Sequence, residues 1–586
     1  MAKKNFSKRQ IKRIKKFEIY YFIGIIFLFF GGVLLTFHQS YDYTLIKNLM
    51  GFLFCLFISI YYLLSRNEFE FSSLLYLPII FFTYILISSF FAPFKFESGK
   101  NLENYILYFL IFLIGTNLKI DKKIFYLWIF SGTIASIVGI FQFYGERHYA
   151  ISTFGNPNFY AGHIIMVLSI LLSNILNTDY KKEMFGNLLR IFDILCLIFC
   201  IWGLIVTKSR AAIMAFLVSC TFVWYFSNYE KKGFSKYIGI IMVFLILLFF
   251  IPKIIDWYKG DIRYFIWKGT WRMILKKPIF GWGFGNFIFF YPYFRVREYF
   301  LQPEATPVTN HAHNEYLEKM AEIGILGLLI YIFFLLTFII SAVKNENKKT
   351  KIFLPGILSG IISVSLDNIF STNLTNPSTS MYFWFLIGIS SQYFYKEKVD
   401  FQVSKLLWIS LFASSLILAV FHSYYRILPQ VYYKKGIFAK ETGNYKESIK
   451  NYSIACELNP YNYECWYKLA YVYGVINKYD ESKKIYLYIN NYLFPHYAKT
   501  DANLGTVYLK IGDIEKGFKY YKIAEWFNPY DEDVLCSIAS IYLMYYNKIN
   551  EALNYLKRIL KINPKNEYAN RVLYLLEKEG KIKRRR

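Results

Sequence analysis

Apolar runs about as long as a bilayer is thick recur along most of this chain. A hydrocarbon core about 30 Å thick selects roughly 20 consecutive apolar residues for a spanning helix. Hydrophobic residues make up 55% of the 586 residues, yet 68 Lys and Arg interrupt them, a mixture that does not suit one soluble core. The sequence therefore predicts an all-α, polytopic helical membrane protein with about 13 spans. They are centred near residues 27, 55, 82, 110, 134, 168, 198, 218, 246, 332, 359, 388 and 413.

Basic residues are distributed unevenly between the segments that join these spans. The N-terminal tail and the loops on its side hold 25 Lys and Arg, whereas the short loops on the other side hold 5. Cytoplasmic loops are enriched in Lys and Arg, so the N-terminus is predicted to be cytoplasmic and the first span uncleaved. The net charge of +28 is accordingly interpreted as an orientation signal, and no nucleic-acid partner is expected.

Two segments on the predicted outer side are large. One is a loop at 256–320, inside a membrane domain at 1–425, and the other follows Tyr425. The outer placement of the C-terminal part depends on the thirteenth span, Leu406–Val420. An even number of spans would instead place the C-terminal part in the cytoplasm.

The C-terminal part, at 430–578, repeats itself. Its helix-breaking prolines recur at spacings of 35, 34 and 35, and turn residues recur between them at 34, 35 and 35. A period near 34 with two helices and a closing proline is typical of tetratricopeptide repeats, which stack into an α-solenoid with a concave surface. A protein partner on that surface is one interpretation, and a spacer without a ligand is the other. The recurring residues are Pro460, Pro495, Pro529 and Pro564, with Gly443, Asn477, Gly512 and Asn547.

Arginines in and near the outer loop are candidates for binding an anion at the membrane surface. Basic residues in so long a loop are not explained by the orientation rule, and guanidinium groups bind phosphate oxygens in pairs. Arg210 begins an apolar span, where a charge is costly, although ordinary snorkelling also explains it. Arg263 lies in the loop, and Arg272, Arg295 and Arg297 are weaker candidates because basic loop residues are usually only solvated.

The end of the loop supplies a candidate base. An imidazole titrates near neutral pH, so His313 suits proton abstraction from an attacking hydroxyl. The alternative is a structural histidine that caps the following helix. His311 is a candidate supporting residue, and Asn314 is predicted to orient the histidine or bind sugar. Gly324 and Gly327 are expected to permit close packing of that helix.

These strings together resemble the O-antigen ligase and polymerase superfamily. The resemblance rests on His313-Asn314 followed by Gly324-Ile-Leu-Gly327, and on the strings TKSRAAIMAF, GDIR, KPIFGWGFGNF and GNPNFYAG. It extends over roughly residues 15 to 400, with the motifs between 155 and 330. It implies an enzyme of the bacterial cytoplasmic membrane that transfers a glycan from an undecaprenyl-diphosphate-type lipid to an acceptor on the outer side. In that scheme Arg210 and Arg263 hold the diphosphate and His313 is the general base.

The nature of the acceptor separates the remaining interpretations. A ligase would use a lipid core, a cell-wall polymer or a protein as acceptor, whereas a polymerase would use another lipid-linked glycan. A transporter would show inverted repeats and ionisable residues in mid-span, and a repeat scaffold without catalysis would leave the loop's Arg and His unexplained. No metal and no other cofactor is expected, because the only DxD-like string, Asp531-Glu532-Asp533, lies in a repeat turn.

Overall fold

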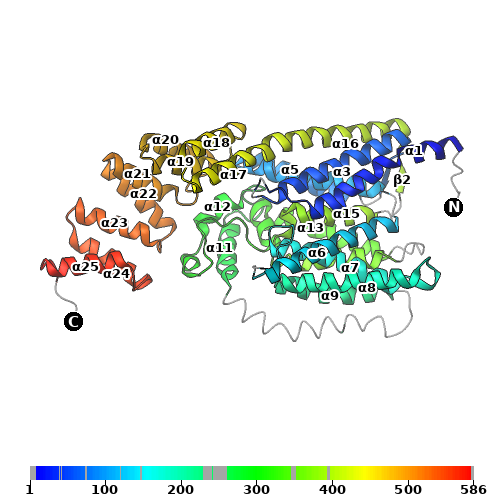
Figure 1. Cartoon of the computed structure of the whole chain (residues 1–586), viewed down its shortest axis with the longest axis horizontal. Coiled ribbons are helices and arrows are strands. Elements are labelled where there is room, and N and C mark those ends of the chain that lie inside the picture. The colour runs from blue at the N-terminus through cyan, green and yellow to red at the C-terminus, as the bar shows by residue number, and fades with distance from the viewer. Residues whose placement is uncertain are drawn as a thin grey trace. The chain divides into compact units, whose positions relative to one another are not determined.

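The computed structural model describes residues 8–38, 40, 42–72, 75–118, 121–145, 148–228, 241, 261–344, 352–391 and 396–582. Helices dominate this part of the chain (Figure 1). The strands it contains are two of three residues each, β1 (Glu70–Ser72) and β2 (Lys396–Lys398), paired antiparallel with Glu70 opposite Lys398. The predicted all-α class is confirmed. The predicted span near residue 246 lies outside the described residues.

A helix is present at each of the other twelve predicted span centres. Eight helical segments of the described chain are long and apolar enough to cross a membrane, and α4 and α14 are shorter apolar helices. The elements are α1 (Lys8–Ile26) continued by η1 (Phe27–Gly31) and α2 (Gly32–Leu34), then α3 (Thr44–Ser65), α4 (Tyr76–Phe91), α5 (Lys95–Asn117), α6 (Lys122–Gly145), α7 (Pro157–Asn177), α8 (Gly186–Val206), α9 (Arg210–Ser227), α13 (Glu315–Lys344), α14 (Leu354–Asp367), α15 (Pro377–Ser390) and α16 (Phe401–His422).

The described chain divides into two compact units. The first unit contains these helices together with residues 274–287 and 311–314. The second unit contains residues 261–273 and 288–310 of the predicted loop together with the C-terminal repeats. Each unit is described by itself below.

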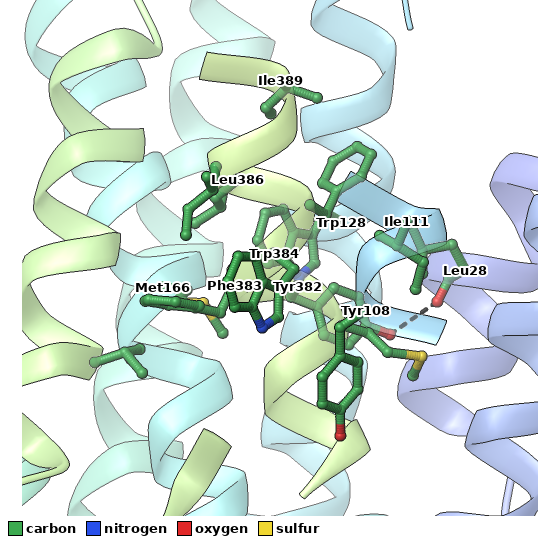
Figure 2. Close-up of a cluster of buried hydrophobic side chains, with 14 of the residues drawn as sticks. Leu28, Tyr108, Ile111, Trp128, Met166, Tyr382, Phe383, Trp384, Leu386 and Ile389 are labelled. Atoms are coloured by element: carbon green, nitrogen blue, oxygen red, sulfur yellow. Dashed lines mark hydrogen bonds between the residues drawn. The ribbon is translucent and has the colours of Figure 1, made fainter. Parts of the chain in front are cut away.

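Helix α15 forms the centre of the first unit. All of its residues from Pro377 to Ser390 are buried, which explains why it has no polar face. Its Tyr382 ring stacks on Trp128 of α6 at 5.3 Å, and the Tyr382 hydroxyl donates to the Leu28 carbonyl at 2.8 Å (Figure 2). A helix buried on every side suits a bundle in which the outer helices, rather than the inner one, face lipid.

The repeats of the second unit are stacked helices. The four predicted turn residues, Gly443, Asn477, Gly512 and Asn547, all have positive φ. Glycine and asparagine tolerate that left-handed backbone better than other residues, which is why they recur there. The helices are α17 (Leu428–Glu441), α18 (Tyr445–Leu458), α19 (Tyr463–Val475), α20 (Tyr479–Tyr488) with η9 (Ile489–Leu493), α21 (Thr500–Ile511), α22 (Ile514–Phe527), α23 (Glu532–Met544), α24 (Ile549–Ile562) and α25 (Glu567–Lys578) (Figure 1).

Candidate active site

The candidate base lies directly before the first turn of α13. The Asn314 side-chain oxygen accepts hydrogen bonds from the backbone N–H groups of Tyr316 and Leu317, at 3.0 and 2.9 Å. Asn314 is therefore the side chain that caps this helix, and His313 is not. His313 has φ of 52°, in the left-handed region that is costly for a residue with a side chain. Such backbone strain concentrates at functional sites.

His311 is held by a carboxylate of α13. Its Nδ1 lies 2.9 Å from Glu318 Oε1, and the other oxygen of Glu318 accepts the backbone N–H of Ala312 at 2.6 Å. Burial lowers the pKa of His311, but the charge and hydrogen bond of Glu318, with the charges of Glu322 and Glu315, outweigh it and raise the pKa above its ordinary value. Glu318 thus fastens the loop that carries His313 to the helix.

The raised pKa of His311 predicts a pH dependence of stability. The ion pair with Glu318 should stabilise the fold fully below pH 6.5, the ordinary pKa of a histidine, and this stabilisation should be lost as pH rises through the raised value. The contribution should be at most about 1 kcal/mol, because the His311 side chain is 37% exposed and water screens the pair. The difference in thermal unfolding between wild type and His311→Ala should therefore be largest below pH 6.5 and should shrink as pH rises above that value. A difference independent of pH would contradict the pairing, and Glu318→Gln should abolish the pH dependence.

Further charged side chains are buried on the same helix. Lys319 Nζ lies 2.7 Å from Glu315 Oε1 and donates to the Tyr105 hydroxyl at 2.6 Å, with both charged side chains less than 10% exposed. Glu322 is also buried and accepts the backbone N–H of Phe287 at 3.1 Å. Buried charges must be paired and mark functional sites in membrane proteins. Sequence reasoning missed these residues, although the spacing of three and four between Glu315, Glu318 and Glu322 places them on one helical face.

Helix α13 is interrupted at Gly324, whose φ and ψ are 70° and 179°. A backbone with those angles is accessible almost only to glycine. A Cβ added at Gly324 would lie 2.0 Å from the Ile279 carbonyl oxygen. The expectation that Gly324 permits close helix packing is therefore incomplete, because the residue also permits a break in the helix. Gly327 fits the packing expectation, since a Cβ there would lie 2.7 Å from the Tyr84 ring.

The string KPIFGWGFGNF packs against this break. The Pro278 carbonyl accepts the Ile325 N–H at 2.8 Å, and the Gly283 N–H donates to the Glu322 carbonyl at 2.8 Å. Backbone groups freed by the interruption thereby find partners. The string is thus a structural support for the start of α13 in this unit.

The two strongest arginine candidates lie in different units. Arg210 is the first residue of α9, is exposed, and belongs to the first unit with His311, His313 and Asn314. Arg263 belongs to the second unit and lies on α11 (Ile262–Lys276), with its Nε 3.9 Å from Asp261 Oδ1.

The weaker arginine candidates all belong to the second unit. Arg295 donates to the Pro307 carbonyl at 3.2 Å and to Thr309 Oγ1 at 3.1 Å, so its own loop holds it. Arg272, on α11, and Arg297, at the start of η4 (Arg297–Leu301), are exposed. Within the described ranges, no three His, Cys, Asp or Glu side chains form a candidate metal site.

A second buried ionic group lies at the C-terminal end of the last predicted span. Glu103 of α5 bonds to His422 Nδ1, and its other oxygen accepts Arg426 Nε at 3.0 Å. The second ring nitrogen of His422 lies 2.9 Å from the Leu45 carbonyl. No sequence signal could have paired these residues, because 319 positions separate Glu103 from His422.

Comparison with known proteins gives two family matches. The O-antigen ligase family matches residues 195–332, and a tetratricopeptide repeat family matches residues 429–462. The first match includes every predicted site residue. An uncharacterized protein of Methanocaldococcus jannaschii is 26% identical over 57 residues, which are 10% of this chain and 66% of that protein. This chain therefore carries an O-antigen ligase family region in its membrane part, followed by tetratricopeptide repeats.

Proposed function

We propose that this protein transfers a glycan from an undecaprenyl-diphosphate-type lipid to an acceptor at the outer face of the bacterial cytoplasmic membrane. The O-antigen ligase family supports transfer of lipid-linked glycans in general. The observation that carries the proposal is His313 itself. It lies inside the matched region and has a left-handed backbone. His311, which is bound by Glu318, precedes it. Helix α13, which buries the charges of Glu315, Lys319 and Glu322, follows it.

Each proposed catalytic side chain has one role in this reaction. The imidazole of His313 takes the proton from an acceptor hydroxyl, whose oxygen then forms a bond to the anomeric carbon of the donor. The bond between that carbon and the diphosphate oxygen breaks, and the lipid diphosphate leaves with the electron pair. Arg210 and Arg263 stabilise the charge that develops on the departing diphosphate. The proton on His313 then passes to water.

The remaining candidates support this arrangement. Asn314 and His311 position the loop that carries the base, as their bonds to α13 indicate. Arg272, Arg295 and Arg297 add positive charge that attracts an anionic substrate to the loop.

Packing within the second unit supports the same side of the membrane for the loop and the repeats. The ring centroid of Phe289, on α12 (Phe287–Phe294), lies 4.2 Å from that of Phe494, and the ring centroid of Tyr293 lies 5.4 Å from that of Phe527. Loop and repeats that pack together must share one side of the membrane. We assign both to the outer side, and this assignment agrees with an odd number of spans. The loop of the same chain thus packs on part of the repeats, and a separate protein partner of the repeats stays a prediction.

Exchanging the proposed clamps for lysine should impair use of the donor. Arg210→Lys and Arg263→Lys should each lower kcat/KM about tenfold or more, because an ammonium group cannot reproduce the paired hydrogen bonds of a guanidinium. Arg190→Lys, an exposed arginine of α8, is the matched control and should retain wild-type kinetics. Unchanged kinetics for both clamp variants would remove the diphosphate role from these arginines.

Deletion of the gene, followed by mass analysis of surface glycans and lipid-linked intermediates, tests the proposed function. A ligase predicts accumulation of full-length glycan on the lipid carrier and its loss from the acceptor. A polymerase, the alternative reaction of this superfamily, predicts accumulation of single lipid-linked repeat units. An unchanged glycan profile would contradict both.

A further inference from the structure

A groove of about 840 Å³ lies within the second unit. Its walls come from η4 of the loop, from α22, from the turn after α22 and from α24. Segments more than 200 residues apart in the sequence thus line one concavity. Binding sites for small molecules are concave and of this order of size, about 300–1,000 Å³.

The groove is strongly basic. Its lining contains four cations, Arg297, Lys522, Arg558 and Lys561, against one carboxylate, Glu525. Glu525 pairs with Lys522 and with Arg558, each at 2.5 Å. Within the part of the chain that the structure describes, no acidic side chain pairs with Arg297 or Lys561, so the single carboxylate of the groove leaves an excess of positive charge. Such a concave positive surface concentrates anions.

Aromatic side chains accompany this charge. Trp526 lines the groove and is 59% exposed, and Tyr530 lines it from the turn that follows α22. The exposed indole offers an apolar ring face that a ligand can cover. Flat rings beside hydrogen-bonding cations suit a saccharide, which offers apolar C–H faces together with polar edges. The Lys522 ammonium and the Arg558 guanidinium are held in place by Glu525, so their donors are preorganised.

We propose that this groove binds an anionic glycan, a saccharide chain whose units carry phosphate or carboxylate groups. The inference rests on the proposed function, because it names the chemical class of the glycan that the enzyme handles. A membrane surface is the less favoured occupant, since helices that lie on a bilayer present a continuous apolar face, whereas this groove presents cations around one exposed indole. The groove would hold the glycan beside the loop that carries Arg295 and Arg297.

Binding to the full chain in nanodiscs of neutral lipid tests the proposal. The probes are fluorescently labelled oligogalacturonate and poly(glycerol phosphate), with a labelled malto-oligosaccharide as the neutral counterpart, and fluorescence anisotropy gives Kd. At least one anionic probe should bind about tenfold or more tightly than the neutral one, and its binding should weaken with added salt. Failure of both anionic probes to bind would overturn the proposal.

Substitutions of groove residues test whether the anionic probe binds in the groove. The double variant Arg297→Gln with Lys561→Gln should raise Kd for the anionic probe about tenfold or more. Trp526→Ala should raise Kd several-fold, and Trp526→Phe, which keeps a ring, should raise it less. Lys510→Gln, an exposed lysine of α21 outside the groove, is the matched control for loss of one charge. Equal Kd for wild type and the double variant would overturn the assignment.

Two further readouts separate the alternatives. If added vesicles of anionic lipid displace the probe from wild type in neutral nanodiscs, and these vesicles bind the double variant more weakly than wild type, the groove binds a membrane surface and the proposal is wrong. Product formation from a lipid-linked donor is measured in parallel. Transfer without anionic-glycan binding would reject the groove alone, whereas binding without transfer would reject the proposed function alone.

Discussion

Replacing His313 with alanine is expected to lower glycan transfer by about 10²- to 10⁴-fold, the usual contribution of a general base. The imidazole is the proposed acceptor of the proton from the attacking hydroxyl, and alanine offers no group that takes a proton. The protein should still insert and fold, since the helix cap is made by Asn314 and the loop is fastened by His311 and Glu318. Transfer is measured with a lipid-linked donor, and folding by thermal unfolding of the purified protein.

Asparagine at the same position is the sharper test. The φ of His313 is 52°, a backbone conformation that histidine and asparagine tolerate better than alanine, so His313→Ala raises the strain as well as removing the imidazole. Asparagine tolerates the left-handed region, so His313→Asn removes the base with less strain. Both variants should lose transfer to the same extent. Wild-type turnover in His313→Asn would exclude His313 as the base and leave it a purely conformational role.

Replacing Gly324 with alanine is expected to destabilise the first unit by about 3 kcal/mol or more. The φ of 70° costs a residue with a Cβ about 1–3 kcal/mol, and overpacking adds about as much. The new methyl group would lie 2.0 Å from the Ile279 carbonyl oxygen, which is backbone and has little freedom to move. The string at 278–283 should separate from α13, so both the thermal midpoint and transfer should fall.

Gly360→Ala is the matched control for that substitution. Gly360 lies in α14 of the same unit, and its added Cβ would meet its nearest neighbour, Leu386, at an ordinary 3.4 Å. Its backbone is helical, so alanine should leave stability unchanged or raise it slightly. Equal unfolding midpoints for wild type and Gly324→Ala would show that the break in α13 is not needed for the fold.

The sequence alone determined the helical architecture. A spanning helix is encoded locally, because twenty adjacent apolar residues suffice to specify it. The repeat turns at Gly443 and Gly512 are encoded in the same way, since left-handed backbone selects glycine wherever it occurs. The family resemblance and its histidine also depend on short adjacent strings, and the ligase and repeat matches confirm the resemblance.

Only the tertiary structure decided which groups meet. The sequence carried no prediction for Glu315, Glu318 and Glu322. They are buried, and Lys319, His311 and the N–H of Phe287 are their partners. Likewise, Gly324 breaks a helix only because a distant string packs beside it. Long-range pairings depend on side chains that come from several elements. Contacts of this kind produce no periodic pattern in the sequence. The apolar runs thus fix where helices form, whereas the contacts between helices fix which charges can be buried.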